Sequence, residues 1–280
     1  MRPPSLSPDT GGRPAAPCLF GEHPHQPAYG FRCPILSLFC RILPVLFTPG
    51  GQSLSVRSRR VGDRVFSTKE VSPMQVLLIN GSPHPKGSTA TALATVAGQL
   101  EKAGIETTTL HVGHKAIRGC IACGKCARTG LCVFKDDPVN ECIERMREAD
   151  GLVVGSPVYY AGPNASLCAL LDRMFYMKSA SYAFKPAAAV VSCRRGGASA
   201  SFDRLNKYFT IARMPVVSSQ YWNSIHGNNA EEAVQDAEGL QIMRALGDNM
   251  AWLLQCIEAG KKAGITPPAV EAWQPTNFIR

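Results

Sequence analysis

Four cysteines stand close together in one segment of the chain, in the pattern C-x2-C-x2-C-x5-C. They are Cys120, Cys123, Cys126 and Cys132. Three thiols at this spacing allow one short loop to wrap around a metal centre, and the fourth follows a turn at Gly130. Structural zinc usually takes two C-x2-C pairs separated by a longer insert, whereas a compact triple with one further cysteine suits a [4Fe-4S] cluster. The four cysteines are therefore predicted metal ligands.

Two other interpretations of these cysteines are open. They could be metal-free thiols, either buried or redox-active, or they could hold zinc. The chain has eleven cysteines, an odd number whose uneven distribution favours a reduced, cytoplasmic protein over a disulfide-stapled one. Four further cysteines lie in helix or strand patterns and are expected in the core: Cys142, Cys168, Cys193 and Cys256.

A loop rich in glycine and hydroxyl groups spans residues 81–89, between an apolar run and a helix pattern. Backbone N–H groups at a helix N-terminus, together with the hydroxyls of Ser82, Ser88 and Thr89, suit a bound phosphate. The loop is not a Walker motif, because Lys86 precedes its glycine, and it lacks the three-glycine dinucleotide fingerprint. We predict an anion site here, with an ordinary strand-to-helix turn as the alternative.

Two adjacent tyrosines, Tyr159 and Tyr160, stand in the loop 156–162 at the end of another apolar run. Side chains at a strand end are normally small or polar, so this pair favours a flat aromatic ligand such as an isoalloxazine ring. Backbone amides near Gly162 could reach the polar edge of such a ring. The alternative is that one tyrosine belongs to the core.

A third loop, residues 192–197, combines two arginines with two glycines. Gly196 and its neighbour allow close backbone approach, and Arg194 and Arg195 could meet flavin oxygens or the phosphate of a pyridine nucleotide. Either arginine could equally be a solvated surface charge.

These three loops lie within an alternation of strand and helix patterns that begins after Met74. The predicted strands cover residues 75–80, 105–112, 151–155, 187–192 and 215–219. The predicted helices cover 88–103, 138–149 with Asp137 as its cap, 164–178, 199–213, and 231–260 with an interruption near Gly239. Such alternation predicts an α/β fold, a parallel sheet covered on both faces, and five strands favour a doubly wound sheet over an eight-stranded barrel. Ligands of such sheets bind beyond the carboxyl ends of the strands, where the three loops lie.

Residues 1–73 differ from the rest of the chain. They hold eleven of the 21 prolines and show neither helix nor strand periodicity. We expect a disordered or misassigned N-terminal extension, with an arginine-rich targeting segment and a structured arm as alternatives. The expected domain is 74–265, followed by a tail, 266–280.

Composition excludes several classes of function. The chain is 45% hydrophobic and 18% charged, which suits a globular core. More than half of its net charge of +9 falls in residues 1–73, which hold nine basic and four acidic residues, so no nucleic-acid surface is expected on the domain. No membrane span is expected either, since the longest apolar stretch, 34–47, is short and contains Arg41.

Several motifs together resemble the NADPH-dependent FMN reductase and iron-sulfur flavoprotein families of the flavodoxin-like fold. They are Gly-Ser-Pro at 81–83, Ser-Pro-Val-Tyr at 156–159, Leu-Asp-Arg at 171–173, the cysteine run at 119–126 and the stretch 202–227. The likeness extends over about 74–265 and implies a sheet of order 2-1-3-4-5. Two positions depart from the family pattern: Cys168 stands where relatives often have lysine, and His84 replaces the usual arginine of the phosphate loop.

The resemblance also implies a cofactor and its contacts. The FMN phosphate would lie at Ser82, His84, Ser88 and Thr89, and the ring at Pro157, Val158, Tyr159, Tyr160 and Gly162. Arg194 and Gly196 of the third loop complete the predicted cofactor site. In iron-sulfur flavoproteins the cluster passes electrons to or from FMN, which is the role implied for the four cysteines. The resemblance further implies a homodimer or homotetramer.

The predicted function is that of an NAD(P)H-dependent FMN reductase. Hydride from NAD(P)H reduces FMN at N5, and the reduced flavin passes electrons to a flavin, quinone or cluster acceptor, either a small molecule or a redox protein. No side chain has to act as an acid or base, so the predicted residues position and tune the flavin. The alternatives are a non-enzymatic electron carrier that holds FMN and a cluster, and an FMN-dependent regulator or scaffold.

Overall fold

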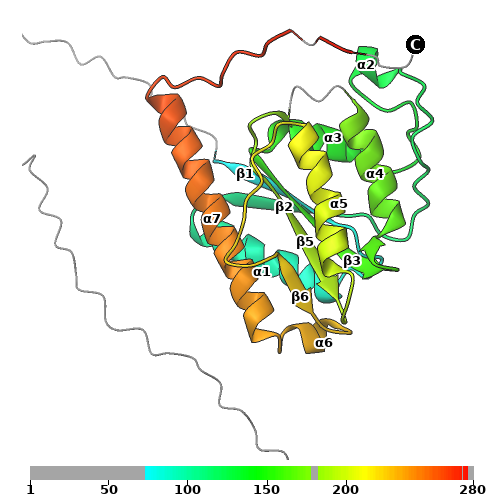
Figure 1. The fold of residues 1–280 in the computed structure, drawn as a ribbon, viewed down its shortest axis with the longest axis vertical. Coiled ribbons are helices and arrows are strands. Elements are labelled where there is room, and N and C mark those ends of the chain that lie inside the picture. The colour runs from blue at the N-terminus through cyan, green and yellow to red at the C-terminus, as the bar shows by residue number, and fades with distance from the viewer. Residues whose placement is uncertain (1–72, 178–181, 273, 277–280) are drawn as a thin grey trace, which may run out of the picture. The chain divides into compact units, whose positions relative to one another are not determined.

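A parallel sheet forms the centre of the domain (Figure 1). The computed structural model describes residues 73–177, 182–272 and 274–276, so the predictions for residues 1–72 lie outside the described residues. The parallel strands are β1 (Gln75–Asn80), β2 (Glu106–His111), β3 (Gly151–Tyr159), β5 (Ala187–Cys193) and β6 (Ser224–His226). Their order is β2-β1-β3-β5-β6, which confirms the predicted flavodoxin-like order 2-1-3-4-5.

Helices cover both faces of this sheet, as the alternating pattern predicts. They are α1 (Ser88–Lys102), α2 (Cys126–Thr129), α3 (Val139–Glu148), α4 (Ala165–Tyr176), α5 (Ala198–Ile211), α6 (Ala230–Ala233) and α7 (Ala237–Lys262). Figure 1 shows α1 and α7 on one side of the sheet and α3, α4 and α5 on the other. Each side has its own hydrophobic core, because alternate strand residues point to opposite faces: Leu77 and Ile79 join one core, Val76 and Leu78 the other.

The prediction of an edge strand at 215–219 is wrong. Within that stretch only Val216 bridges β5, at Ala187, after which the chain leaves the sheet. It returns as β6, where Ser224 pairs with Val191 and two further residues continue the ladder. The edge position of the sheet is therefore shared between the bridge at Val216 and strand β6. The segment Ser224–His226 is short and contains no apolar run, so nothing in the sequence indicated a strand there.

The interruption of the last helical segment lies slightly before the predicted position at Gly239. Helix α6 ends at Ala233, and α7 begins after Asp236, whose carboxylate accepts a hydrogen bond from the Gly239 N–H at 2.9 Å. A Cβ at Gly239 would stand 2.4 Å from that carboxylate, so the glycine makes room for the cap.

One predicted core residue is exposed. Cys142 and Cys193 are buried and Cys168 is partly buried, but Cys256 on α7 faces solvent. The buried stripe of α7 includes Leu246, Met250 and Leu254, at helical spacing, and position 256 falls off that stripe. None of the helices in the described part of the chain combines the length and the apolar composition that a membrane span requires.

A chain that starts at Met74 is expected to fold with an unchanged melting temperature. Among the described residues, all strands of the sheet begin at or after Gln75, and both hydrophobic cores draw their members from residue 74 onward. Thermal unfolding of the two chains, followed by circular dichroism, tests this. A large loss of stability or solubility in the shorter chain would show that the first 73 residues are part of the fold.

Candidate functional site

An open cavity lies beyond the carboxyl ends of β1, β3 and β5. It measures about 1290 Å³, including the part open to solvent. Eight of the eleven residues predicted to bind the cofactor line it: Ser82, His84, Ser88, Thr89, Pro157, Val158, Tyr159 and Arg194. The other three, Tyr160, Gly162 and Gly196, are not part of its lining. The three loops singled out in the sequence therefore meet at one place, at the edge of the sheet where doubly wound folds bind ligands.

The first loop leads into a helix N-terminus that no side chain caps. Gly87 occupies the N-cap of α1 and offers no side-chain acceptor, so the N–H groups of the first turn have no capping partner. Ser82 shapes the loop before it: its N–H donates to Asn80 Oδ1 at 3.0 Å, and its hydroxyl accepts the N–H of His84 at 3.1 Å. This is the arrangement that attracts an anion to a helix N-terminus.

The two hydroxyls at the start of α1 already have partners. The Ser88 hydroxyl donates to the carbonyl of Asn229 at 2.9 Å. Thr89 is buried, and its Oγ1 lies 2.7 Å from Oγ of Ser192 at the end of β5. Both contacts tie the first loop to neighbouring walls of the cavity.

The tyrosine loop is a tight hairpin. Strand β4 (Gly162–Pro163) pairs antiparallel with the end of β3, with Tyr159 opposite Gly162. The residues between them, Tyr160 and Ala161, have φ angles of 49° and 58°, as both central residues of a type I′ turn require. Tyr159 is 45% exposed and lines the cavity, and Tyr160 is fully exposed. Neither tyrosine is therefore a core residue.

The third loop packs directly against this hairpin. Arg194 lines the cavity, whereas Arg195 is exposed and is not part of the lining. Gly197 has a φ of 94°, and a Cβ there would stand 2.7 Å from Cα of Ala161 and 2.8 Å from Cγ1 of Val158. Only glycine fits, so this contact fixes the position of the hairpin against the end of β5.

Gly197→Ala is expected to destabilise the fold by about 2 to 4 kcal/mol, because the left-handed backbone and the clash with the hairpin both oppose a Cβ. Gly196→Ala is the matched control, since a Cβ at Gly196 would meet nothing within 4 Å. That variant should stay within about 0.5 kcal/mol of the wild type. Urea unfolding measures both, and equal losses would show that the contact between the two loops carries no weight.

Sequence reasoning missed one wall of the cavity. Residues 227–231 line it and lead into α6, and the Gly227 N–H donates to the Cys193 carbonyl at 3.1 Å. The cluster Gly-Asn-Asn at 227–229 is a turn signal. It went unused because the edge strand was placed at 215–219 instead of directly before it.

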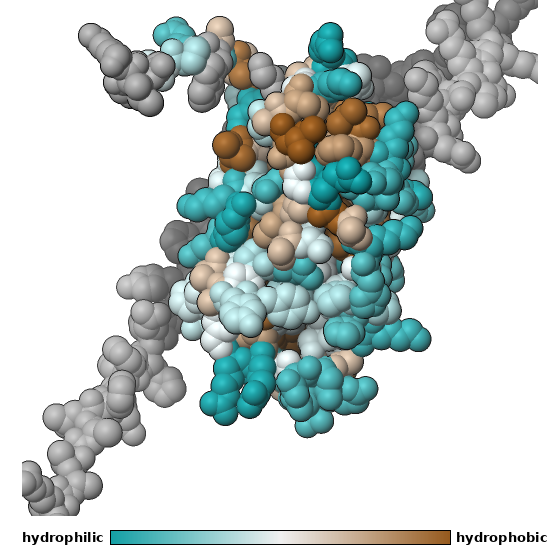
Figure 2. All heavy atoms as spheres, turned by 90° about the vertical axis from the view of Figure 1, so that its right-hand side faces the viewer, coloured by the Kyte–Doolittle hydropathy of each residue, from teal (hydrophilic) through white to brown (hydrophobic). Residues whose placement is uncertain are grey.

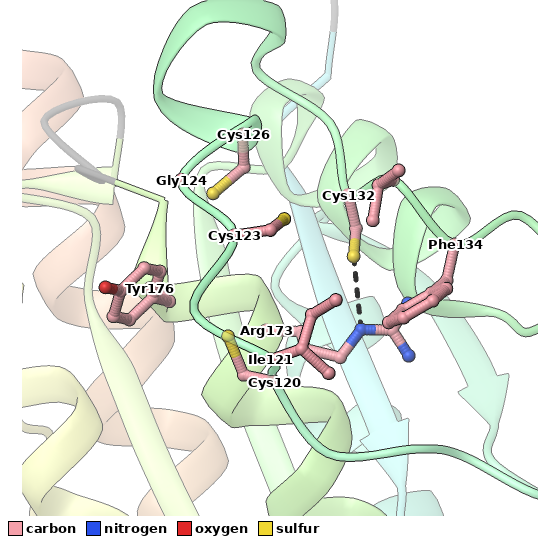
Figure 3. A pocket seen from close by; sticks show the side chains of 10 residues that line it. Cys120, Ile121, Cys123, Gly124, Cys126, Cys132, Phe134, Arg173 and Tyr176 are labelled. Atoms are coloured by element: carbon pink, nitrogen blue, oxygen red, sulfur yellow. Dashed lines mark hydrogen bonds between the residues drawn. The ribbon is translucent and has the colours of Figure 1, made fainter.

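A second, smaller cavity of about 350 Å³ is lined by all four cysteines of the predicted metal site. Figure 3 shows Cys120, Cys123 and Cys126 along one stretch of loop and Cys132 on the facing stretch, with Arg173 and Tyr176 of α4 beside them. The loop also exposes Ile121 and Val133. Hydrophobic side chains gather over the upper part of the face in Figure 2, which looks onto this side of the molecule.

The four thiols differ in their exposure to solvent. Cys120 and Cys123 are exposed, and Cys126 and Cys132 are partly buried. Burial raises the pKa of the Cys126 thiol. Within the described residues, no three side chains of the kind that bind metals are close enough together to hold an ion. The donor set of four thiols on one cavity suits a thiolate-ligated centre, but the exposed thiols would have to close in, so the shared metal site stays a prediction.

The backbone of Cys132 is fixed by the first turn of α3. The Asn140 side chain accepts the Cys132 N–H at 2.7 Å and donates to the carbonyls of Cys132 and Phe134 at 3.1 and 2.9 Å. The N-cap of α3 is Pro138 and not the predicted Asp137, although the Asp137 carboxylate, one residue earlier, accepts the N–H of Val139 at 3.2 Å. Asn140 was not singled out in the sequence, because nothing local marks a contact made eight residues away.

Comparison with known proteins agrees with this arrangement. Residues 74–229 match the family model for NADPH-dependent FMN reductase. An iron-sulfur flavoprotein of Methanocaldococcus jannaschii is 32% identical over 196 residues, which cover 66% of this chain and all of that protein. An iron-sulfur flavoprotein of Methanosarcina thermophila is 31% identical over 194 residues, which cover 67% of this chain and 99% of that one.

Among solved structures, an NAD(P)H:quinone oxidoreductase from Methanothermobacter marburgensis superposes with a TM-score of 0.51 at 17% identity. The match covers 64% of this chain and 96% of that one, and it shows a shared fold. The family-model match covers more than half of the chain, and the relative from Methanocaldococcus jannaschii is covered over its whole length. The chain therefore belongs to the family of NADPH-dependent FMN reductases and iron-sulfur flavoproteins.

Proposed function

We propose that the chain binds FMN in the first cavity and acts as an NAD(P)H-dependent oxidoreductase. The observation that carries the proposal is the uncapped N-terminus of α1 at one wall of an open cavity that has Tyr159 at another. An anion site beside an aromatic side chain suits a ligand with a phosphate at one end and a flat ring at the other. The family name and the names of the relatives support the same ligand.

In this proposal, one set of residues binds the phosphate of FMN and another contacts its ring. The first-turn N–H groups of α1, with Ser88, Thr89 and His84, hold the phosphate, and Pro157, Val158 and Tyr159 contact the ring. Ser88 would exchange its bond to a backbone carbonyl for one to the phosphate. Tyr160, Gly162 and Gly196 lie outside the lining, so we assign them no contact in this conformation.

When bound, FMN would supply the redox chemistry that carries electrons from NAD(P)H to an acceptor. The side chains of the cavity position the cofactor and place a positive charge beside it. Arg194 is exposed on the cavity wall and carries a positive charge where a pyridine nucleotide would approach, so it is suited to its phosphate.

We further propose that Cys120, Cys123, Cys126 and Cys132 hold a [4Fe-4S] cluster as a second redox centre. The convergence of all four on one cavity supports this, as do the relatives named iron-sulfur flavoproteins. Helix α4 starts just after the tyrosine hairpin and carries Arg173 and Tyr176, which line the cysteine cavity, near its other end. Its 12 residues correspond to about 18 Å.

A second candidate function, favoured by the cysteine cavity, is a non-enzymatic electron carrier. In that case FMN and cluster would exchange electrons with a protein partner and NAD(P)H would not be oxidised. The exposed side chains around the cysteines, Ile121 and Val133, suit contact with another protein.

Anaerobically purified protein tests these proposals together. We expect flavin absorption bands with broad additional absorption from the cluster, and steady-state oxidation of NADPH when FMN or a quinone is supplied as acceptor. Flavin without NADPH or NADH oxidation would leave the carrier and contradict the reductase. A protein that binds neither FMN nor riboflavin would contradict the whole proposal.

We also propose that the chain works as a homodimer or homotetramer. Tyr160 is fully exposed at the hairpin, and Tyr221 and Trp222 are 59% and 57% exposed before β6. Large exposed aromatic side chains are typical of interface centres. Light scattering after size-exclusion chromatography tests this, and a monomer at micromolar concentration would contradict it.

A further inference from the structure

Arg173 is a buried charged side chain in contact with one of the four cysteines. Its side chain is 1% exposed, and its Nε donates to Sγ of Cys132 at 3.2 Å. Figure 3 shows the guanidinium at the wall of the cysteine cavity with Nε directed at this sulfur. A guanidinium in such a place needs a specific partner for every donor, since burial without partners is costly.

Most donors of Arg173 have oxygen acceptors. One terminal nitrogen pairs with the Asp137 carboxylate, the other reaches the same carboxylate at 3.1 Å, and the carbonyl of Arg118 accepts at 3.3 Å. The guanidinium also lies over the ring of Phe134, 5.2 Å from its centre. Burial lowers the pKa of Arg173, but the bonds to Asp137 and Cys132 outweigh it and raise the pKa, so the side chain stays charged.

The Asp137 pair accounts for the terminal nitrogens and leaves Nε for the sulfur. Without an acceptor at Sγ, a buried N–H donor would be unpaired, which is unfavourable. A thiolate that accepts a charged N–H is a better acceptor than a neutral thiol. The contact therefore holds Cys132 Sγ at the cavity wall as the acceptor of the Arg173 Nε–H.

We propose that Arg173 is a positioning residue that aims Cys132 Sγ into the cavity and raises the reduction potential of the cluster held there. This inference rests on the cluster in the proposed function. A hydrogen bond to a ligating sulfur withdraws negative charge from the cluster and so stabilises its reduced form. Asn140 holds the backbone of Cys132 and Arg173 holds its sulfur, so in this proposal Cys132 is the fixed ligand of the cluster.

The test compares two Arg–Asp pairs of the same part of the chain. Removing Arg173 alone would leave Asp137 buried and unpaired and could unfold the protein, so the main variant is Arg173→Gln with Asp137→Asn. The matched control is Arg118→Gln with Asp136→Asn, a pair that joins exposed side chains at 2.6 Å and of which neither residue lines the cysteine cavity. Arg173→Lys keeps the charge while removing the Nε donor.

The measurement is an anaerobic redox titration of the holoprotein, followed by the cluster's visible absorption, together with iron and FMN content. We expect the Arg173/Asp137 variant to need about tenfold stronger reducing conditions for half reduction, about 59 mV for a one-electron couple. Arg173→Lys should shift less in the same direction, and the Arg118/Asp136 control should match the wild type. Loss of iron in both Arg173 variants, with FMN retained and the control loaded, would also support the positioning role.

Two results would overturn the inference in distinguishable ways. A loaded Arg173/Asp137 variant whose potential equals that of the control would contradict the role of Arg173 and leave the cluster intact. Wild-type protein that binds FMN but contains no iron after anaerobic preparation would contradict the cluster itself, and this inference with it.

Discussion

Replacing Cys123 by Ser is expected to remove nearly all iron from anaerobically prepared protein while FMN stays bound. A [4Fe-4S] centre needs its thiolate ligands, and Cys123 is part of the cavity that all four cysteines share. The wild type should contain about four irons per chain. The flavin should survive the change, because the residues that line the first cavity belong to other loops.

Cys256→Ser is the matched control for this change. Cys256 is an exposed cysteine on α7 that lines neither the flavin cavity nor the cysteine cavity. Iron and FMN contents of this variant should equal those of the wild type. If Cys123→Ser keeps its iron, or if both variants lose it equally, the four-cysteine site is not the place where iron binds.

Alkylation separates a cluster from metal-free thiols. Cys120 and Cys123 are exposed, so as free thiols they would react in the untreated protein. As cluster ligands they would react only after chelation or oxidation removes the iron. Mass spectrometry of the alkylated peptides gives the answer for each position, and rapid labelling of all four in anaerobic protein would leave a plain flavin reductase.

The strands and helices that form the first cavity were largely predictable from sequence. The strand Gln75–Asn80 has a continuous apolar run at 76–79 and is followed by Gly-Ser-Pro, and a buried parallel strand with a tight turn after it produces that pattern. Helix α1 begins at Ser88 as predicted, because the hydroxyl-rich loop before it and the apolar periodicity after it mark the same boundary. The strand order followed from the family resemblance.

What could not be predicted depends on contacts between distant segments. Arg173 and Cys132 lie 41 positions apart, and Leu-Asp-Arg is equally compatible with a solvated helix surface until α4 is packed against the cysteine loop. The tyrosine hairpin was missed because Tyr160 and Ala161 are unusual residues for left-handed positions, which turn patterns assign to Gly and Asn. Packing across the fold decides the role of Arg173, and the close contact of Val158 and Ala161 with Gly197 holds the hairpin, so local rules failed at both places.

The second large expected effect is on FMN affinity, after removal of two hydroxyls at the predicted phosphate site. Ser88→Ala combined with Thr89→Ala is expected to weaken FMN binding on the order of a hundredfold or more, while riboflavin binding changes little. Each hydrogen bond to a charged phosphate contributes about 1.5 to 3 kcal/mol, and 1.4 kcal/mol corresponds to a tenfold change in Kd. Riboflavin lacks the phosphate, so it reports on the rest of the site.

Two controls keep this result interpretable. Thr89 is buried and its Oγ1 contacts Ser192, so Thr89→Ala also disturbs the cavity wall. Thr89→Ser retains the hydroxyl and should keep most of the affinity for FMN. Thr91→Ala removes a hydroxyl of the same helix that bonds to the carbonyl of Gly87 and does not line the cavity, so it should leave both ligands unaffected.

Fluorescence titration of the apoprotein with each flavin measures the ratio of the two affinities. This ratio matters more than either value, because a general loss of stability lowers both affinities together and leaves the ratio unchanged. Since the amides of the first turn remain in the double variant, some preference for FMN over riboflavin should persist. Equal losses for FMN and riboflavin would show that the loop at 81–89 is a structural turn and that the phosphate lies elsewhere.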